Sequence, residues 1–291
     1  MTGTKGEKWF YRANGLILTL VGLSCVLPLV HIAALSLSGK FALAAGSVGF
    51  WPRDFDTAAY RGLFLEMPML QSFRNSVVIT LVGTTLNMLF TIMAAYPLSK
   101  RYFLGRKVYS FGVIFTMLFG AGMIPNYLLV KSLGLIDTYG ALWLPGLVSV
   151  WNLMVLRSFF ESLPEELEEA ARIDGCSEWR LLARIVLPLS LPVLAALSLF
   201  YGVGQWNSFM NVLLYMNSSA KWNLSVLVQQ LFQNREFFDE MANTRPDLAV
   251  ILTPEGVKAA GVVVMTLPML IVYPFLQRFF VKGVMIGAVK G

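Results

Sequence analysis

Six long apolar stretches constrain the fold of this 291-residue chain more than any other feature. A helix that crosses the hydrocarbon core of a bilayer needs about 20 mostly apolar residues. Stretches of this kind run over residues 14–37, 75–98, 109–131, 138–160, 187–213 and 257–280. Hydrophobic residues make up 56% of the chain, more than the core of a soluble domain of this length would use. The sequence therefore predicts an all-α membrane protein with six transmembrane helices.

The first apolar stretch follows Lys5, Lys8 and Arg12, an arrangement that is also typical of a secretory signal peptide. The apolar core of a signal peptide is only about 7–15 residues long. Residues 14–37 form a longer run, so we expect them to be a retained first span.

The basic residues are distributed unevenly between the two sides that this topology defines. Lysines and arginines near short loops favour the cytoplasmic side of a membrane. If the N-terminus is cytoplasmic, 14 of the 23 lysines and arginines lie on that side. These residues are Lys5, Lys8, Arg12, Lys100, Arg101, Arg106, Lys107, Arg157, Arg172, Arg180, Arg184, Arg278, Lys282 and Lys290. The pattern predicts two cytoplasmic termini, and its short juxtamembrane blocks indicate contact with lipid headgroups and no nucleic-acid partner.

The polar residues inside the apolar stretches are nearly all neutral. Ion-coupled carriers commonly place ionisable groups at membrane depth, so this scarcity indicates an external energy source. The neutral residues allow two interpretations, namely hydrogen bonds between helices or the lining of a polar translocation path. The aromatic residues among the candidates offer flat faces for a sugar ring, although such residues also act as packing or interface anchors. The candidates for the path are Trp151, Asn152, Tyr201, Gln205, Trp206 and Asn207.

The connection between the fourth and fifth stretches has the signals of a helix at both ends. Ser162 and Glu165 fit a capping box, and Pro164 would fall in the first turn, where its missing N–H group costs nothing. Gly175 is placed to end the helix. We therefore predict a cytoplasmic helix within residues 163–175.

One face of this predicted helix would carry Leu167, Ala170 and Ala171. Such a face needs a covering surface, and the pattern leaves open whether that surface is the chain's own bundle or another protein. Small alanine side chains permit close approach in either case.

The same segment resembles the EAA loop of binding-protein-dependent ABC importer permeases. Glu169, Ala170, Ala171 and Gly175 are followed, after nine residues, by the run 185–188, whose sequence is Ile-Val-Leu-Pro. The resemblance extends from about the second apolar stretch to the C-terminus. It implies the type I ABC importer fold, in which this connection is a coupling helix that docks on an ATP-binding subunit.

The resemblance also implies the roles of individual residues and of partners. The ATPase-coupling residues would be Glu169, Ala170, Ala171, Arg172, Asp174 and Gly175. The partners would be a second homologous permease, two ABC ATPase subunits and an extracellular or periplasmic solute-binding protein, in a bacterial plasma (inner) membrane. The chain has no G-x-x-x-x-G-K-[ST] phosphate loop. We therefore expect ATP and Mg²⁺ on the ATPase subunits, and no catalytic residue, metal site or cofactor in this chain.

Three further segments resemble the carbohydrate-uptake branch of these permeases, specifically its maltose-type second permease. They are residues 163–175, the run 205–209 (Gln-Trp-Asn-Ser-Phe) and the tail from residue 280 to 291. The resemblance implies a sugar as cargo, expected to be an oligosaccharide. The run 120–125 (Gly-Ala-Gly-Met-Ile-Pro) further resembles a sub-branch for uronate-containing oligosaccharides.

Two alternatives remain open at this point. The cargo of the same kind of permease could instead be an amino acid or a polyamine, and the chain could be an ion-coupled carrier that works alone. For the domain organisation we expect three parts. Residues 1–74 would form the cytoplasmic N-terminus, the first span and an outer loop, residues 75–281 the permease core, and residues 282–291 a cytoplasmic tail.

Overall fold

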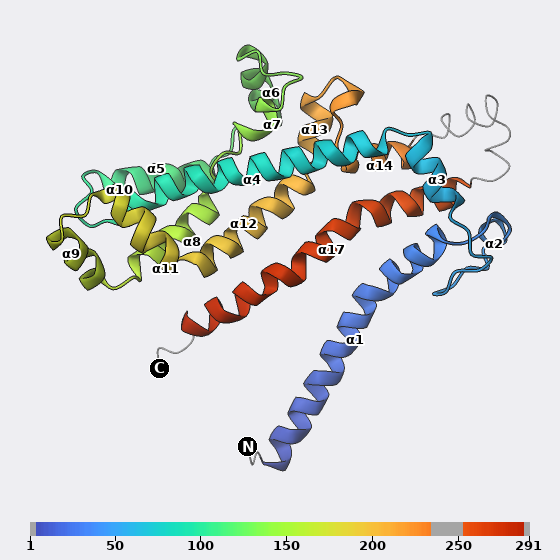
Figure 1. The fold of residues 1–291 in the computed structure, drawn as a ribbon, viewed down its shortest axis with the longest axis horizontal. Coiled ribbons are helices and arrows are strands. Elements are labelled where there is room, and N and C mark those ends of the chain that lie inside the picture. Colours follow the sequence, from blue (N-terminus) through green and yellow to red (C-terminus); the bar gives the residue numbers. More distant parts are fainter. Residues whose placement is uncertain (1–3, 234–252, 288–291) are drawn as a thin grey trace. The chain divides into compact units, whose positions relative to one another are not determined.

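The computed structural model describes residues 4–233 and 253–287, and these residues are mostly helical (Figure 1). Within them the structure shows no strand, only an isolated bridge between Ser38 and Phe55. The last tail residues, 288–291, lie outside the described residues. The α-helices are α1 (Lys5–Ser36), α2 (Lys40–Ala44), α3 (Ala58–Leu65), α4 (Met69–Ser99), α5 (Arg106–Leu118), α6 (Met123–Ser132), α7 (Gly140–Trp143), α8 (Val150–Glu161), α9 (Glu165–Ile173), α10 (Glu178–Leu181), α11 (Leu187–Leu189), α12 (Leu191–Trp206), α13 (Phe209–Tyr215), α14 (Leu224–Gln233) and α17 (Pro254–Gly287). A π-helical turn, η1 (Leu182–Val186), joins α10 to α11, and a 3-10 turn, η2 (Ser219–Lys221), precedes α14.

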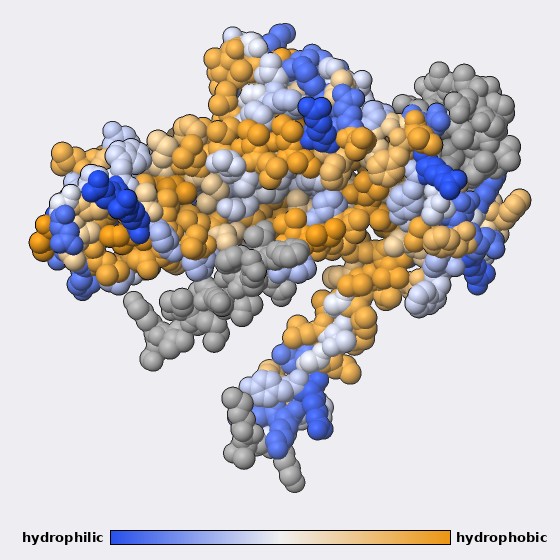
Figure 2. Space-filling view, viewed as in Figure 1, coloured by the Kyte–Doolittle hydropathy of each residue, from blue (hydrophilic) through white to orange (hydrophobic). Residues whose placement is uncertain are grey.

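Three of the described helices are long and apolar enough to cross a membrane. They are Gly6–Ser36, Met69–Ser99 and Pro254–Pro274. Two bent helix pairs also pass this test, α5 with α6 at 114° and the α10–α11 segment with α12 at 83°. Hydrophobic residues cover most of the visible surface of these long helices (Figure 2). The described residues therefore form a multi-pass membrane protein with three candidate spans, or up to five if each bent pair is one span, near five of the six predicted stretches.

The prediction of one continuous helix over residues 138–160 is wrong. The chain forms the short helix α7, leaves the helical conformation, and forms α8 only from Val150. Pro145 lacks a donor N–H group and Gly146 lowers the helical propensity of the same turn, so the helix breaks there.

Side chains from other helices satisfy the backbone of this break. The Asn87 amide donates hydrogen bonds to the carbonyls of Gly146 and Leu147, at 2.7 and 2.9 Å. The Ser149 N–H group donates to the Tyr201 hydroxyl at 2.9 Å. Irregular backbone is tolerated at membrane depth only where such partners or a water-filled cavity exist. The network therefore permits a broken helix inside an apolar bundle.

The chain divides into two compact units. Unit one joins the residues up to Leu70 with Leu227–Pro268, and unit two joins Gln71–Val226 with the residues from Met269 onward. In unit one, the segment after α1 folds back on its end, and His31 Nδ1 lies 2.8 Å from the Gly49 carbonyl oxygen.

In unit two, a core of buried side chains holds α4, α8, α10 and α12 together. Its fully buried members include Leu153, Leu156, Leu181, Val186 and Leu197. In Figure 1, α9 and α10 lie near the C-terminal end of α4, and α13 lies toward its N-terminal half. The segment that resembles the EAA loop is thus at one end of the bundle.

The Asn87 contacts predict a large effect of the substitution Asn87→Leu. The change keeps a similar volume but removes the donor for two carbonyls, and each unsatisfied buried polar group costs about 1–3 kcal/mol. We expect a lower thermal unfolding midpoint in detergent. The matched control, Thr116→Val, removes an exposed hydroxyl that bonds only to its own helix. Equal midpoints for the two variants would contradict the role assigned to Asn87.

Candidate functional site

Helix α9 begins differently from the sequence prediction. Its N-cap residue is Pro164, which provides no side-chain cap, and Ser162 belongs to the end of α8. The Ser162 hydroxyl donates to the Phe159 carbonyl at 2.7 Å, so the predicted capping box with Glu165 is wrong. The first turn is nevertheless acidic, with Glu165, Glu166 and Glu168 at the positive end of the helix dipole.

Helix α9 ends as the sequence predicted. Gly175 has a φ of +76°, a left-handed conformation that glycine adopts without strain. The Gly175 N–H group donates to the Arg172 carbonyl at 3.0 Å, and the Cys176 N–H group donates to the Ala171 carbonyl at 2.9 Å. These two bonds form a Schellman motif. Gly175 therefore turns the chain from α9 toward α10.

The segment after the turn runs without a loop into a span. Ser177 occupies the N-cap position of α10 but its side chain makes no capping bond. Helix α10, turn η1 and helix α11 follow one another directly, and α12 begins after Ser190. The chain thus leads from α9 to α12 through the helical segment Glu178–Leu189 and a bend of 83° at Ser190.

The residues predicted to share one face of α9 differ in exposure in the structure. Ala171 is buried in the same core as Leu156 and Leu181, so it contacts the chain's own bundle. Glu169 and Ala170 are exposed, and Ile173 has 86% of its surface exposed. Placing Ala170 and Ala171 on one shared docking face is therefore wrong, because only Ala170 remains accessible in this chain.

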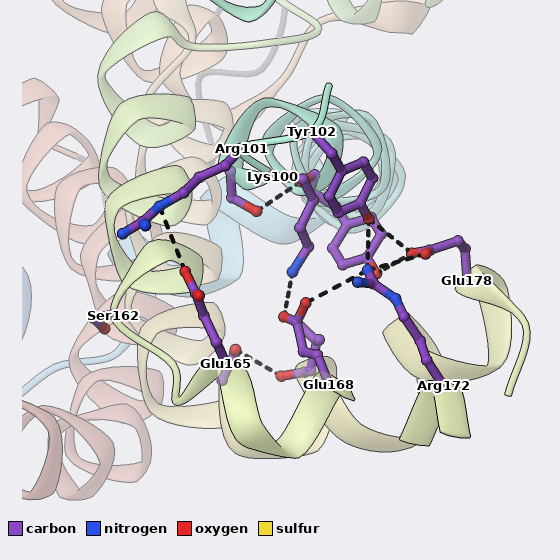
Figure 3. Close-up of polar contacts among 12 residues, drawn as sticks. Lys100, Arg101, Tyr102, Ser162, Glu165, Glu168, Arg172 and Glu178 are labelled. Carbon is purple, nitrogen blue, oxygen red and sulfur yellow. Dashed lines mark hydrogen bonds and ion pairs between the residues drawn. The ribbon is translucent and has the colours of Figure 1, made fainter. Parts of the chain in front are cut away.

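A nearly buried ion pair fixes α9 to the end of α4. Lys100 Nζ contacts Glu168 Oε1, and the two side chains are only 8% and 13% exposed (Figure 3). Glu168 Oε2 also lies 3.8 Å from Arg172 Nη2, one turn further along α9. Sequence reasoning predicted an ATPase contact for Glu169 and did not identify Glu168 as a contact within the chain. The i,i+4 spacing of Glu168 and Arg172 was the local signal for this pairing.

Arg172 connects α9 to two other segments. Its Nη2 lies 3.1 Å from Glu178 Oε1 and donates to the Tyr102 hydroxyl at 2.8 Å. Glu178 also accepts a hydrogen bond of 2.7 Å from the Tyr96 hydroxyl. We call Tyr96, Lys100, Tyr102, Glu168, Arg172 and Glu178 the α9 anchor. Arg172 was predicted as a contact for a partner, but in this chain it holds α9 in place.

Charge and burial in the anchor shift several pKa values, among them those of Tyr102 and Arg172. Burial raises the pKa of the Tyr102 phenol, and the nearby Glu178 carboxylate raises it further. Burial alone would lower the pKa of Arg172, but Tyr102, Glu178 and Glu168 raise it. Both groups are already protonated at neutral pH, and these shifts extend their protonation to higher pH.

A polar cleft of about 460 Å³ lies between α9 and the segment that follows α4. Its lining includes the anchor residues Lys100, Tyr102, Glu168 and Arg172. The exposed pair of Arg101 and Glu165, with Nε and Oε1 3.5 Å apart, also lies here. The last predicted coupling residue, Asp174, is exposed at the C-terminal end of α9.

The structure brings together two of the six residues predicted for a translocation path. The Tyr201 hydroxyl shares a 2.7 Å hydrogen bond with Thr91 Oγ1. Gln205 Nε2 donates to Asn87 Oδ1 at 2.9 Å. Both residues of α12 thus join the network that supports the broken helix.

The other four predicted path residues lie in different environments. Trp206 is buried with its ring in edge contact with Phe73, and Asn152 is also buried. Trp151 is 62% exposed and Asn207 is exposed. The structure therefore does not gather the six residues into one cluster within this chain.

A multi-pass bundle of broken helices, with a charged helix anchored at one end between two spanning segments, defines the membrane-embedded subunit of a transporter. The chain belongs to the family described as the binding-protein-dependent transport system inner membrane component, whose model matches residues 58–286. Members of this family are permease subunits of ABC importers and are not themselves enzymes.

Similar proteins cover nearly the whole chain. Protein LplC of Bacillus subtilis is 46% identical over 293 residues, covering 100% of this chain and 98% of LplC. The polygalacturonan/rhamnogalacturonan transport system permease protein YtcP of the same organism is 42% identical, with 94% of this chain and 96% of YtcP covered. A crystal structure of a bacterial ABC transporter involved in the import of the acidic polysaccharide alginate matches with a TM-score of 0.87 and 29% identity. That match covers 96% of this chain and 99% of the solved chain.

The α9 anchor predicts that Lys100→Met loosens α9. Removing one partner of a buried ion pair leaves an uncompensated charge and costs about 3–5 kcal/mol. We expect faster amide hydrogen exchange within residues 165–173, measured by mass spectrometry. The double variant Lys100→Met/Glu168→Leu removes both charges and should restore much of the protection.

The matched control for this change is Arg101→Gln. Arg101 neighbours Lys100, but its ion pair is exposed and such pairs contribute only about 0–1 kcal/mol. If amide hydrogen exchange in α9 is equally slow in Lys100→Met and in Arg101→Gln, the buried Lys100–Glu168 pair does not hold the helix.

Proposed function

We propose that this chain is a permease subunit of an ABC importer that moves an acidic, uronate-containing oligosaccharide into the cell. The observation that carries the proposal is the 42% identity, over 94% of the chain, to a permease named for polygalacturonan and rhamnogalacturonan transport. The alginate importer supports it, because alginate is described as an acidic polysaccharide and its permease covers almost the same length. These relatives favour a sugar over an amino acid or a polyamine.

The proposed architecture is the type I importer fold with six spans. Five spans correspond to the long helices and bent pairs, and the remaining one would consist of α7, the break and α8. Both termini would be cytoplasmic in a bacterial inner membrane, as the distribution of basic residues favours. The division into residues 1–74, 75–281 and 282–291 belongs to the same proposal.

In this proposal α9 is the coupling helix. The α9 anchor holds one side of the helix against the permease, and Glu169, Ala170 and Ile173 stay exposed for the cleft of an ABC ATPase subunit. Two such subunits would bind ATP and Mg²⁺, and a second permease and a solute-binding protein would complete the assembly. Closure of the ATPase pair would move α9 and, through α10 to α12, shift the bundle between inward-open and outward-open states.

The cargo is tested with the complete importer in proteoliposomes, including its partner permease, ATPase subunits and binding protein. We expect uptake of galacturonate oligosaccharides that requires ATP on the ATPase side and the loaded binding protein outside. A binding protein that takes an amino acid and no sugar would contradict the cargo. Uptake that continues without the ATPase subunits would contradict the importer mechanism and favour a carrier that works alone.

The coupling role predicts that Gly175→Val abolishes this uptake. A β-branched residue is strained at a φ of +76°, so the turn after α9 would be displaced. Glu169→Lys should have the same result because it reverses an exposed charge at the proposed contact. The measurements are ATP-driven uptake and co-purification of the ATPase subunits.

Gly134→Val is the matched control for Gly175→Val. Gly134 has a φ of +67° and lies between α6 and α7, away from α9, so the change imposes similar backbone strain elsewhere. We expect uptake to survive in this control. Wild-type uptake in both Gly175→Val and Glu169→Lys would show that α9 is not the coupling element.

A further inference from the structure

Helix α4 presents a row of small and polar residues to α12 inside unit two. The row follows a helical spacing of three and four residues, which places its members on one face. Gly83, Thr84, Asn87 and Thr91 contact α12, and Thr80 continues the row one turn earlier on the same face. The facing residues on α12 are Tyr201, Gly202 and Gln205, and we call the two rows together the polar seam.

The two helices approach closely along the polar seam. A Cβ atom built on Gly83 would lie 2.8 Å from Gln205 Cδ, closer than real side-chain contacts allow. The Gln205 side chain therefore lies directly on the backbone of Gly83. A Cβ atom on Gly202 would lie 3.6 Å from Thr84 Oγ1, which is ordinary contact. Gly83 thus leaves room on α4 for the Gln205 side chain, and Gly202 lets Thr84 of α4 approach the backbone of α12.

Two hydroxyls of the polar seam have no hydrogen-bond partner among the residues that the structure describes. They are Thr80 Oγ1 and Thr84 Oγ1, and both atoms are buried. The other threonines in the long helices have partners: Thr85 bonds back to the Leu81 carbonyl of its own helix at 2.8 Å, and Thr91 bonds to the Tyr201 hydroxyl at 2.7 Å. A buried polar group without a partner costs about 1–3 kcal/mol, so this pair needs an explanation.

We infer that Thr80 and Thr84 are positioning residues that receive the amide of Gln205 in a second conformation, in which α12 is displaced along α4. The inference rests on the proposed alternating-access function. Gln205 now bonds to Asn87, and Thr84 lies about one helical turn before Asn87 on the same face. Thr80 lies a further turn away. One-turn displacements of one packed element past another are an established type of switching motion.

The change of hydrogen-bond partner of Gln205, from Asn87 to a threonine hydroxyl, would keep the two conformations close in free energy. In the present conformation Gln205 is paired with Asn87 and the threonine hydroxyls are unpaired. After the displacement a hydroxyl would be paired and the Asn87 Oδ1 atom would lose its donor. The Asn87 amide could still hold the carbonyls of Gly146 and Leu147. Each conformation thus leaves some polar group without a partner, which is what a readily shifted equilibrium requires.

The test is the double variant Thr80→Val/Thr84→Val in the complete importer. Valine keeps the shape of threonine but removes the hydroxyl, so the present conformation should lose nothing. We expect a thermal midpoint of the purified complex at or above that of the parent, together with ATP-driven uptake lowered by about fivefold or more. The matched control, Thr85→Val, removes an exposed hydroxyl on the same helix and should change neither quantity.

Uptake by the double variant within about twofold of the parent would overturn the inference while leaving the proposed function intact. A parent complex that shows no ATP-driven uptake would overturn both. If the double variant does not assemble, Thr84→Ser and Thr84→Ala compare a retained with a removed hydroxyl. Higher uptake by the serine variant supports the inference, and equal uptake by the two overturns it.

Discussion

The Asn87 side chain makes the contacts on which the arrangement of unit two depends. Its amide donates to two carbonyls at the break before α8, and its oxygen accepts from Gln205 on α12. Because lipid offers no hydrogen bonds, a broken helix persists at membrane depth only with such internal partners. One neutral side chain thereby joins α4, the break and α12. The positions of Tyr201 and Ser149 follow from the same network.

A different kind of interaction holds the end of the bundle. The α9 anchor uses ion pairs, one of them with both side chains nearly buried, where desolvation makes each charge depend on its partner. Neutral hydrogen bonds hold the helices that would move in the proposed mechanism, and hydrogen-bonded ion pairs at the end of the bundle hold α9 in place. Rigidity at α9 would let a contact on its exposed face displace the whole segment that leads into α12. The two types of interaction are thus suited to different mechanical tasks.

The sequence predicted the features that depend on local physics. The long spans were found because hydropathy adds up along a continuous helix, and Gly175 was found because a left-handed turn selects glycine at one position. The prediction over residues 138–160 failed because it gave hydropathy more weight than a local break signal, and the prediction at Ser162 failed because one residue fits two helix ends. Pro145 and Gly146 were sufficient to break the helix, and Ser162 was used to end α8 instead of starting α9. The pairing of Lys100 with Glu168 was not predictable, because 68 positions separate the two residues and only the fold brings them together.

Helix α4 belongs to both the α9 anchor and the polar seam, so it would transmit a displacement of α9 to α12. Its C-terminal end is fixed to α9 through the α9 anchor, and its middle contacts α12 through the polar seam. Helix α12 also follows the segment that leaves α9, after a bend of 83° at Ser190. A displacement of α9 therefore reaches the seam by two routes, one through α4 and one through α10 to α12. If α4 and α12 moved together, the contacts of the polar seam would not change. A new hydrogen-bond partner for Gln205 therefore requires that α4 and α12 are displaced by different amounts. In the proposed mechanism the bend of 83° between the α10–α11 segment and α12, which has no counterpart in the continuous α4, would provide that inequality.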